Sequence, residues 1–201
     1  MLNEMTYLRR MVITAMLIAV GVVLPLAFHS IPRAGSILLP MHIPVLLAGL
    51  ICGPFFGLVS GLITPLLSSI TTGMPPAGFI VYSMMIELAV YGLVAGLAMR
   101  LIHTGRSSFD LYISLIAALI VGRVVAGMAQ ALVFFSGEGG YTIALWVASY
   151  FVTSLPGLVI QIIFVPSMVM ALERERVIPL RYPFLTKKQT SVTTSSTTVS
   201  G

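Results

Sequence analysis

Charged side chains are the scarcest feature of this sequence. Asp, Glu, Lys and Arg make up 8% of its 201 residues, whereas they make up about 25% of an ordinary soluble domain. Hydrophobic residues make up 58%. This composition excludes a soluble globular domain and predicts a chain that crosses a membrane several times.

Cysteine is almost missing, and the common catalytic motifs are missing as well. The single Cys52 has no partner for an internal disulfide, and in an apolar run it is a small packing residue. No Walker A pattern is present, and the GLVSG stretch at 57–61 is not the G-x-S-x-G of a nucleophile elbow. Neither an acidic cluster nor a Cys/His spacing indicates a metal site. We therefore expect no enzyme, no cofactor and no metal.

The longest uncharged stretch lies between Arg33 and Glu87 and covers 53 residues. It holds half of the 12 prolines, and its glycines recur every fourth residue at 49, 53, 57 and 61. One helix of this length would measure about 80 Å, whereas the hydrocarbon core of a bilayer is about 30 Å thick. The stretch is therefore predicted to cross the membrane and turn back at Gly53 and Pro54, with its glycines serving close helix packing. Broken backbone at membrane depth is tolerated where it is buried in protein or lines a cavity.

Six apolar segments predict an all-α membrane protein with six transmembrane helices in one bundle, at residues 10–28, 38–53, 55–70, 79–102, 111–135 and 143–172. With the N-terminus inside, nine basic residues fall on the inner face: Arg9, Arg10, Arg100, Arg106, Arg174, Arg176, Arg181, Lys187 and Lys188. Only Arg33 falls on the outer face. This bias predicts that both termini are cytoplasmic. Residues 1–175 then form a transmembrane substrate-binding domain, and 176–201 a cytoplasmic, partly disordered Ser/Thr-rich tail.

Two charges are predicted within spans, Glu87 in the fourth and Arg123 in the fifth. A charge at membrane depth costs about 2.5–3.5 kcal/mol on insertion scales and usually faces the bundle interior and a partner. Two interpretations stay open. The two side chains form an ion pair that locks two helices, or Arg123, whose planar guanidinium suits carboxylates, anchors an anionic or polar ligand. A ligand that completes the pair would combine both.

Polar side chains on spans four to six predict a ligand pocket that opens outward, because buried donors need partners in an apolar medium. The prolines at the outer ends of the hairpin frame its entrance. The predicted substrate-binding residues are Arg123, Glu87, Tyr91, Gln130, Trp146, Tyr150, Gln161, His42 and Met74. For Trp146 and Tyr150 the alternative is an ordinary aromatic belt at the membrane interface. For His42 and Met74 the alternatives are ordinary loop polarity and a plain connector.

Three parts of the sequence resemble one family. They are Ala15-Met-Leu-Ile-Ala19 in the first span, MHIPVLLAGLICGP with GLITPLLSSITTGMPP in the hairpin, and IELAVYGLVAGL in the fourth span. Together they resemble the S component, the membrane-embedded substrate-binding subunit, of bacterial energy-coupling factor (ECF) vitamin transporters. The resemblance covers about residues 5–175. It implies a multi-pass protein of the bacterial cell membrane that binds a vitamin from outside with high affinity.

The resemblance also implies partners. In this family the S component docks on a transmembrane coupling subunit that carries two cytosolic ATPases, so Ala15 and Ala19 are expected to form the partner interface. Small residues at this spacing allow two helices to approach closely. The outer loops at 29–42 and 71–78 are expected to border the site. The hairpin is most similar to S components assigned to pantothenate, while hydroxymethylpyrimidine, cobalamin and folate stay open.

Two other functions agree less well with the sequence. A self-sufficient secondary transporter would use Glu87 as a proton-coupling carboxylate, but no inverted repeat is visible and 201 residues is small for alternating access in one chain. A membrane enzyme or assembly factor is disfavoured because no nucleophile–base or metal constellation is present.

Overall fold

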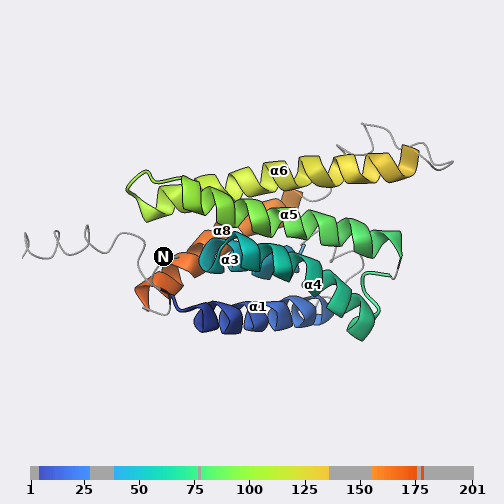
Figure 1. Ribbon diagram of the computed structural model, residues 1–201, viewed down its shortest axis with the longest axis horizontal. Coiled ribbons are helices and arrows are strands. Elements are labelled where there is room, and N and C mark those ends of the chain that lie inside the picture. The colour runs from blue at the N-terminus through green and yellow to red at the C-terminus, as the bar shows by residue number, and fades with distance from the viewer. Residues whose placement is uncertain (1–4, 28–38, 77, 136–154, 176–177, 179–201) are drawn as a thin grey trace, which may run out of the picture.

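Six helices form the bundle in the computed structural model, which describes residues 5–27, 39–76, 78–135, 155–175 and 178. They are α1 (Tyr7–Ala27), α3 (His42–Cys52), α4 (Pro54–Thr72), α5 (Phe79–Leu101), α6 (Ser107–Phe135) and α8 (Leu155–Arg174) (Figure 1). Five of the described helices are long and apolar enough to cross a membrane, and α3 is shorter, at 11 residues. The predicted all-α membrane fold is confirmed.

The predicted helix boundaries agree with the described ones to within a few residues. The sixth predicted span is confirmed from Leu155 onward, since residues 143–154 lie outside the described part of the chain. The tail predicted for 176–201 also lies outside it, apart from Ile178. The division into a transmembrane domain and a tail therefore stays a prediction.

A one-residue turn joins α3 to α4, as the Gly53–Pro54 pair predicts. Gly53 has a φ of 107°, which side chains with a Cβ rarely adopt. Its N–H donates to the carbonyl of Gly49 at 3.0 Å, which closes the last turn of α3. Pro54 then begins α4, where its missing N–H leaves no helical hydrogen bond unmade. The two helices form a tight hairpin.

The backbones of α3, α4 and α5 touch at glycines. A Cβ on Gly49 or Gly57 would collide with the carbonyl of Gly92, and a Cβ on Gly92 would collide with the carbonyl of Gly57. Gly96 lies in the same way against Pro54 and the turn before it. Without side chains in between, the three helices approach more closely than larger residues would allow. The predicted packing role of the hairpin glycines is confirmed, and two glycines of α5 complete the contact.

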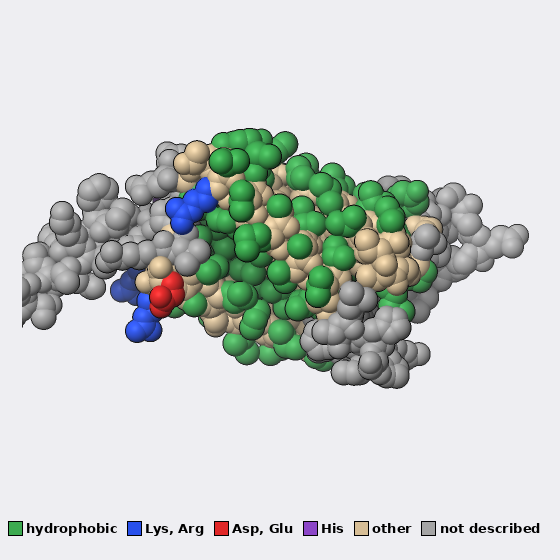
Figure 2. Space-filling model, turned by 90° about the horizontal axis from the view of Figure 1, so that it is seen from below, with side chains coloured by type: hydrophobic (Ala, Val, Ile, Leu, Met, Phe, Trp, Pro, Cys, Tyr) green, Lys and Arg blue, Asp and Glu red, His purple; other side chains and the backbone are tan. Residues whose placement is uncertain are grey.

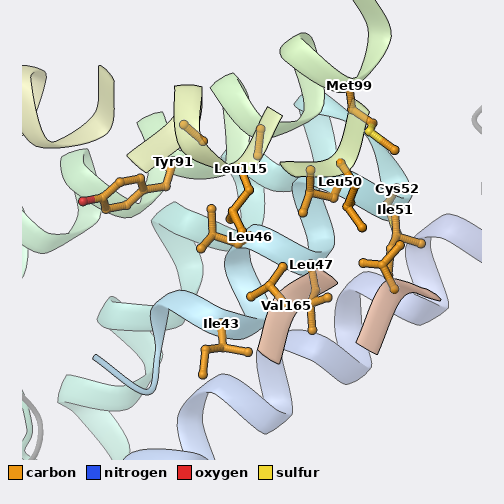
Figure 3. Close-up of a cluster of buried hydrophobic side chains, with 14 of the residues drawn as sticks. Ile43, Leu46, Leu47, Leu50, Ile51, Cys52, Tyr91, Met99, Leu115 and Val165 are labelled. Carbon is orange, nitrogen blue, oxygen red and sulfur yellow. The ribbon is translucent and has the colours of Figure 1, made fainter. Parts of the chain in front are cut away.

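Every residue of α3 is buried. Its leucines Leu46, Leu47 and Leu50 lie in one hydrophobic cluster with Leu115 of α6 and Val165 of α8 (Figure 3). At 1.5 Å per residue α3 is about 16 Å long, roughly half the hydrocarbon thickness. It is therefore the inner element of the bundle, wrapped by its neighbours, and it fixes the position of its first residue, His42.

Basic residues gather at one end of the bundle, which we call the basic end: Arg9, Arg10, Arg100, Arg106 and Arg174. Figure 2 shows a largely hydrophobic face with charged side chains at this end. The Ser107 hydroxyl donates to both carboxylate oxygens of Glu173, at 3.0 and 3.3 Å, and so joins the start of α6 to the end of α8. The clustering agrees with the positive-inside pattern; that the basic end is cytoplasmic stays a prediction.

Candidate functional site

A buried polar cluster joins the start of α3 to the middle of α5. The Tyr91 hydroxyl donates to Glu87 Oε1 at 3.1 Å. The His42 Nε2 atom lies 3.6 Å from the same oxygen, within ion-pair range but beyond an ordinary hydrogen bond. The rings of His42 and Tyr91 meet edge to face, with their centroids 5.2 Å apart. Three polar side chains therefore converge within the apolar bundle, on the α3–α5 contact that the glycines make close.

Helix α6 packs against this cluster through Gly122. Gly122 packs against the Tyr91 ring, where a Cβ would collide with the ring atoms Cδ1 and Cε1. Arg123 follows it directly, and its residue is only 2% exposed. It lies 16 residues after Ser107 and 12 before Phe135, or about 24 and 18 Å from the two helix ends. A full positive charge is thus buried near the middle of α6, next to the residue that supports Tyr91.

Helix α8 contributes a buried amide. Gln161 is 0% exposed and lies on the inward stripe of α8 with Gly157 and Val165. Within the described residues, neither its amide nitrogen nor its amide oxygen has a hydrogen-bond partner, and the same is true of both ring nitrogens of His42. A buried polar group without a partner costs about 1–3 kcal/mol. Such groups call for a partner such as a ligand or an ordered water.

The loop between α4 and α5 carries Met74, which is 48% exposed. The hydroxyl of Ser68 donates to the Met74 carbonyl, and that of Ser69 to the Pro75 carbonyl, both at 2.8 Å. Gly73 ends α4 in the left-handed conformation, with a φ of 70°. The backbone of this loop is therefore tied to the last turns of α4, while the Met74 side chain projects from it.

Of the nine predicted substrate-binding residues, the structure brings His42, Glu87 and Tyr91 into one cluster. It also buries Arg123 on α6, directly after Gly122, and Gln161 on α8. Gln130 lies in α6, but its side chain is outside the described part, as are Trp146 and Tyr150 altogether. The roles of all nine in ligand binding stay predictions.

The contact between His42 and Glu87 was not predicted from the sequence. The spacing of four placed Tyr91 on the face of Glu87, and Arg123 was the predicted charge partner of Glu87. The structure gives Glu87 the partners His42 and Tyr91, while its pairing with Arg123 stays a prediction. The available signal was a histidine inside an uncharged run, a residue that needs a polar partner when it is buried.

A protein-family model described as "ECF transporter, substrate-specific component" matches residues 9–169, about four fifths of the chain. The chain belongs to this family of ECF S components. No curated protein and no solved structure matches it. This S component is therefore a non-catalytic transport subunit, a multi-pass protein of the prokaryotic cell membrane that binds a substrate and couples with an ECF energising module.

The first helix of the S component shows the two alanines of the predicted partner interface. Ala15 and Ala19 are both exposed, whereas the neighbouring Thr14 is buried and its hydroxyl donates to the Arg10 carbonyl at 2.7 Å. An exposed small-residue pair on a helix leaves room for a second helix to approach. Its use as the coupling surface stays a prediction.

Proposed function

We propose that this S component binds a water-soluble vitamin or a related small metabolite from outside the cell and delivers it inward. The observation that carries the proposal is a set of large polar side chains buried in the bundle: His42, Glu87, Tyr91, Arg123 and Gln161. Charges and unpartnered amides at membrane depth are costly and are characteristic of substrate sites. The energy for transport comes from its partners, since the S component is itself non-catalytic.

Pantothenate is the favoured ligand within this proposal. Two features support it: the resemblance of the hairpin sequence to pantothenate-type S components, and a carboxylate that suits the guanidinium of Arg123. Hydroxymethylpyrimidine, cobalamin and folate are the other candidates. The proposed ligand entrance lies in the half of the bundle opposite the basic end, at the α4–α5 loop that carries Met74.

The proposed partners are a transmembrane coupling subunit and two cytosolic ATPases, which together supply the energy of ATP hydrolysis. The coupling subunit would pack on the exposed face of α1 at Ala15 and Ala19. In this arrangement the ligand binds inside the bundle, whereas the coupling subunit packs on the outer face of α1.

Ligand binding to the purified S component tests the proposal directly. Pantothenate, hydroxymethylpyrimidine, cobalamin and folate are screened by thermal shift and calorimetry. A ligand at 100 times its Kd stabilises the folded state by about 2.7 kcal/mol, which raises Tm by several degrees for a chain of this size. If no vitamin or related metabolite binds the intact protein, the proposal is wrong.

Arg123→Ala separates a ligand anchor from a structural ion pair. We expect this change to weaken ligand binding by about 10- to 100-fold, the loss of one or two charge-assisted hydrogen bonds, and to affect expression and Tm much less. Calorimetry and thermal unfolding of the same preparation check this. An equal loss of folded protein and of binding would instead support the ion pair.

The contact between His42 and Glu87 favours one alternative function, that of a proton-coupled secondary transporter that works without partner subunits. Two titratable side chains lie 3.6 Å apart at membrane depth, as a proton relay would require. Proteoliposomes that contain only this protein distinguish the two functions. Uptake driven by a pH gradient in the absence of the energising module would favour the alternative.

A further inference from the structure

The hydrogen bond and the ion-pair contact that Glu87 makes with the described residues both fall on one of its two carboxylate oxygens. Oε1 accepts the hydrogen bond from Tyr91 and faces the imidazole of His42. Within the described residues, Oε2 has no hydrogen-bond donor. An ionised carboxylate has roughly four acceptor positions, so half of this group is still open.

The two residues that lie at Oε1 are less exposed than Glu87 itself. Tyr91 is 0% exposed, its hydroxyl is used by Glu87 and its ring is backed by Gly122. His42 is 2% exposed, as the first residue of a helix that is buried on every side. The Tyr91 side chain therefore presents no exposed surface to a ligand while this arrangement holds.

Glu87 is the most exposed member of the cluster, with 7% of the residue and 10% of its side chain accessible. One oxygen of this carboxylate is fixed by Tyr91, and the other is free to bind a ligand. The carboxylate needs a hydrogen-bond donor at the open oxygen, because an unmatched charge in an apolar interior is costly.

We propose that Glu87 contacts the ligand through Oε2, and that Tyr91 is a positioning residue which orients its carboxylate without touching the ligand. This inference rests on the proposed function and narrows the substrate class. Because a carboxylate only accepts hydrogen bonds, the ligand carries a hydroxyl, amino or amide N–H group at this point. A molecule that offers only acceptors does not fit there, whereas the hydroxyls of pantothenate and the amino group of hydroxymethylpyrimidine do.

A double-mutant cycle on affinity tests the division of roles, with pantothenate and hydroxymethylpyrimidine as calorimetric probes. Glu87→Gln should weaken binding of the probe that binds by about 10- to 100-fold, and Tyr91→Phe by about 2- to 10-fold. If Tyr91 acts only through Glu87, Tyr91→Phe has no further effect in the Glu87→Gln protein. Glu175→Gln, the same substitution at an exposed position near the basic end, should leave affinity unchanged.

A second measurement uses the unmodified protein, so it holds even where a variant does not fold. An analogue of the bound probe, with its hydroxyl or amino groups replaced by hydrogen, should bind about 10- to 100-fold more weakly. Equal affinity for this analogue, wild-type affinity of Glu87→Gln, or additive effects of the two substitutions each overturn the inference and leave the proposed function standing. If neither these probes nor cobalamin or folate binds, both fail together.

Discussion

Gly92→Ala should destabilise the protein, although alanine favours helices over glycine. The added Cβ would collide with the backbone of Gly57, across the contact between α4 and α5. Overpacking a core by one methyl group costs about 1–3 kcal/mol, and the upper end applies because the obstructing atoms are backbone. The helix gains about 1 kcal/mol from alanine. The net loss is therefore about 2 kcal/mol.

Thermal unfolding in detergent measures this loss. For a chain of 201 residues, about 1 kcal/mol corresponds to a Tm change of about 2–4 °C, so we expect Tm to fall by about 4–8 °C. The matched control is Gly21→Ala. Its Cβ would meet side-chain atoms instead, the methyl carbon of Thr64 at 2.6 Å and the ring of Pro44 at 3.6 Å.

Side chains can yield where backbone cannot, so the control should lose less than half as much as Gly92→Ala. An unchanged or higher Tm for Gly92→Ala, or an equal fall in both variants, would refute the close-packing argument. Gly92→Ala should also weaken ligand binding, because the same contact sets the distance between α3, which carries His42, and α5, which carries Glu87.

Three further outcomes are expected. Ala15→Trp with Ala19→Trp should leave ligand binding intact and abolish ATP-driven uptake by the assembled transporter, because both alanines are exposed on α1; retained uptake would remove their coupling role. Gly122→Ala should weaken binding about as much as loss of the hydroxyl that it supports, by about 2- to 10-fold in calorimetry, because its Cβ displaces the Tyr91 ring; unchanged affinity would contradict that support. Ser107→Ala should lower Tm by about 2–4 °C, the effect of about 1 kcal/mol from one lost hydrogen bond, without changing affinity; a change in affinity would show that the basic end influences the site.

The long helices and the hairpin were predictable because each depends on local information. Apolar length identifies a span, and a glycine followed by a proline identifies the turn between α3 and α4. The short length and complete burial of α3 were not predictable. In a membrane protein, side chains that face lipid and side chains that face another helix are equally apolar. The sequence therefore did not indicate that Leu46 and Leu50 face protein only.

In the candidate site, too, some features depend on local sequence and others on contacts between helices. Arg123 and Glu87 were identified by the cost of a charge at membrane depth, which depends on the sequence position alone. The partner of Glu87 depends instead on the register between α3 and α5, and that register is set where Gly49 meets Gly92. Because a contact between two helices is a tertiary property, the proximity of His42 to Glu87 followed only from the fold.

The complete burial of α3 has a consequence for the order in which this protein assembles. A helix of 11 residues is too short to cross the bilayer by itself, so its surroundings must be provided by the other helices. One of them is α8, which packs against α3 and is the last of the described helices along the chain. The hydrophobic surroundings of α3, and with them the position of His42 beside Glu87, are therefore completed only after α8 has been synthesised. A chain that stops before α8 would leave the α8-facing side of α3 uncovered, and it would be a natural substrate for membrane quality control.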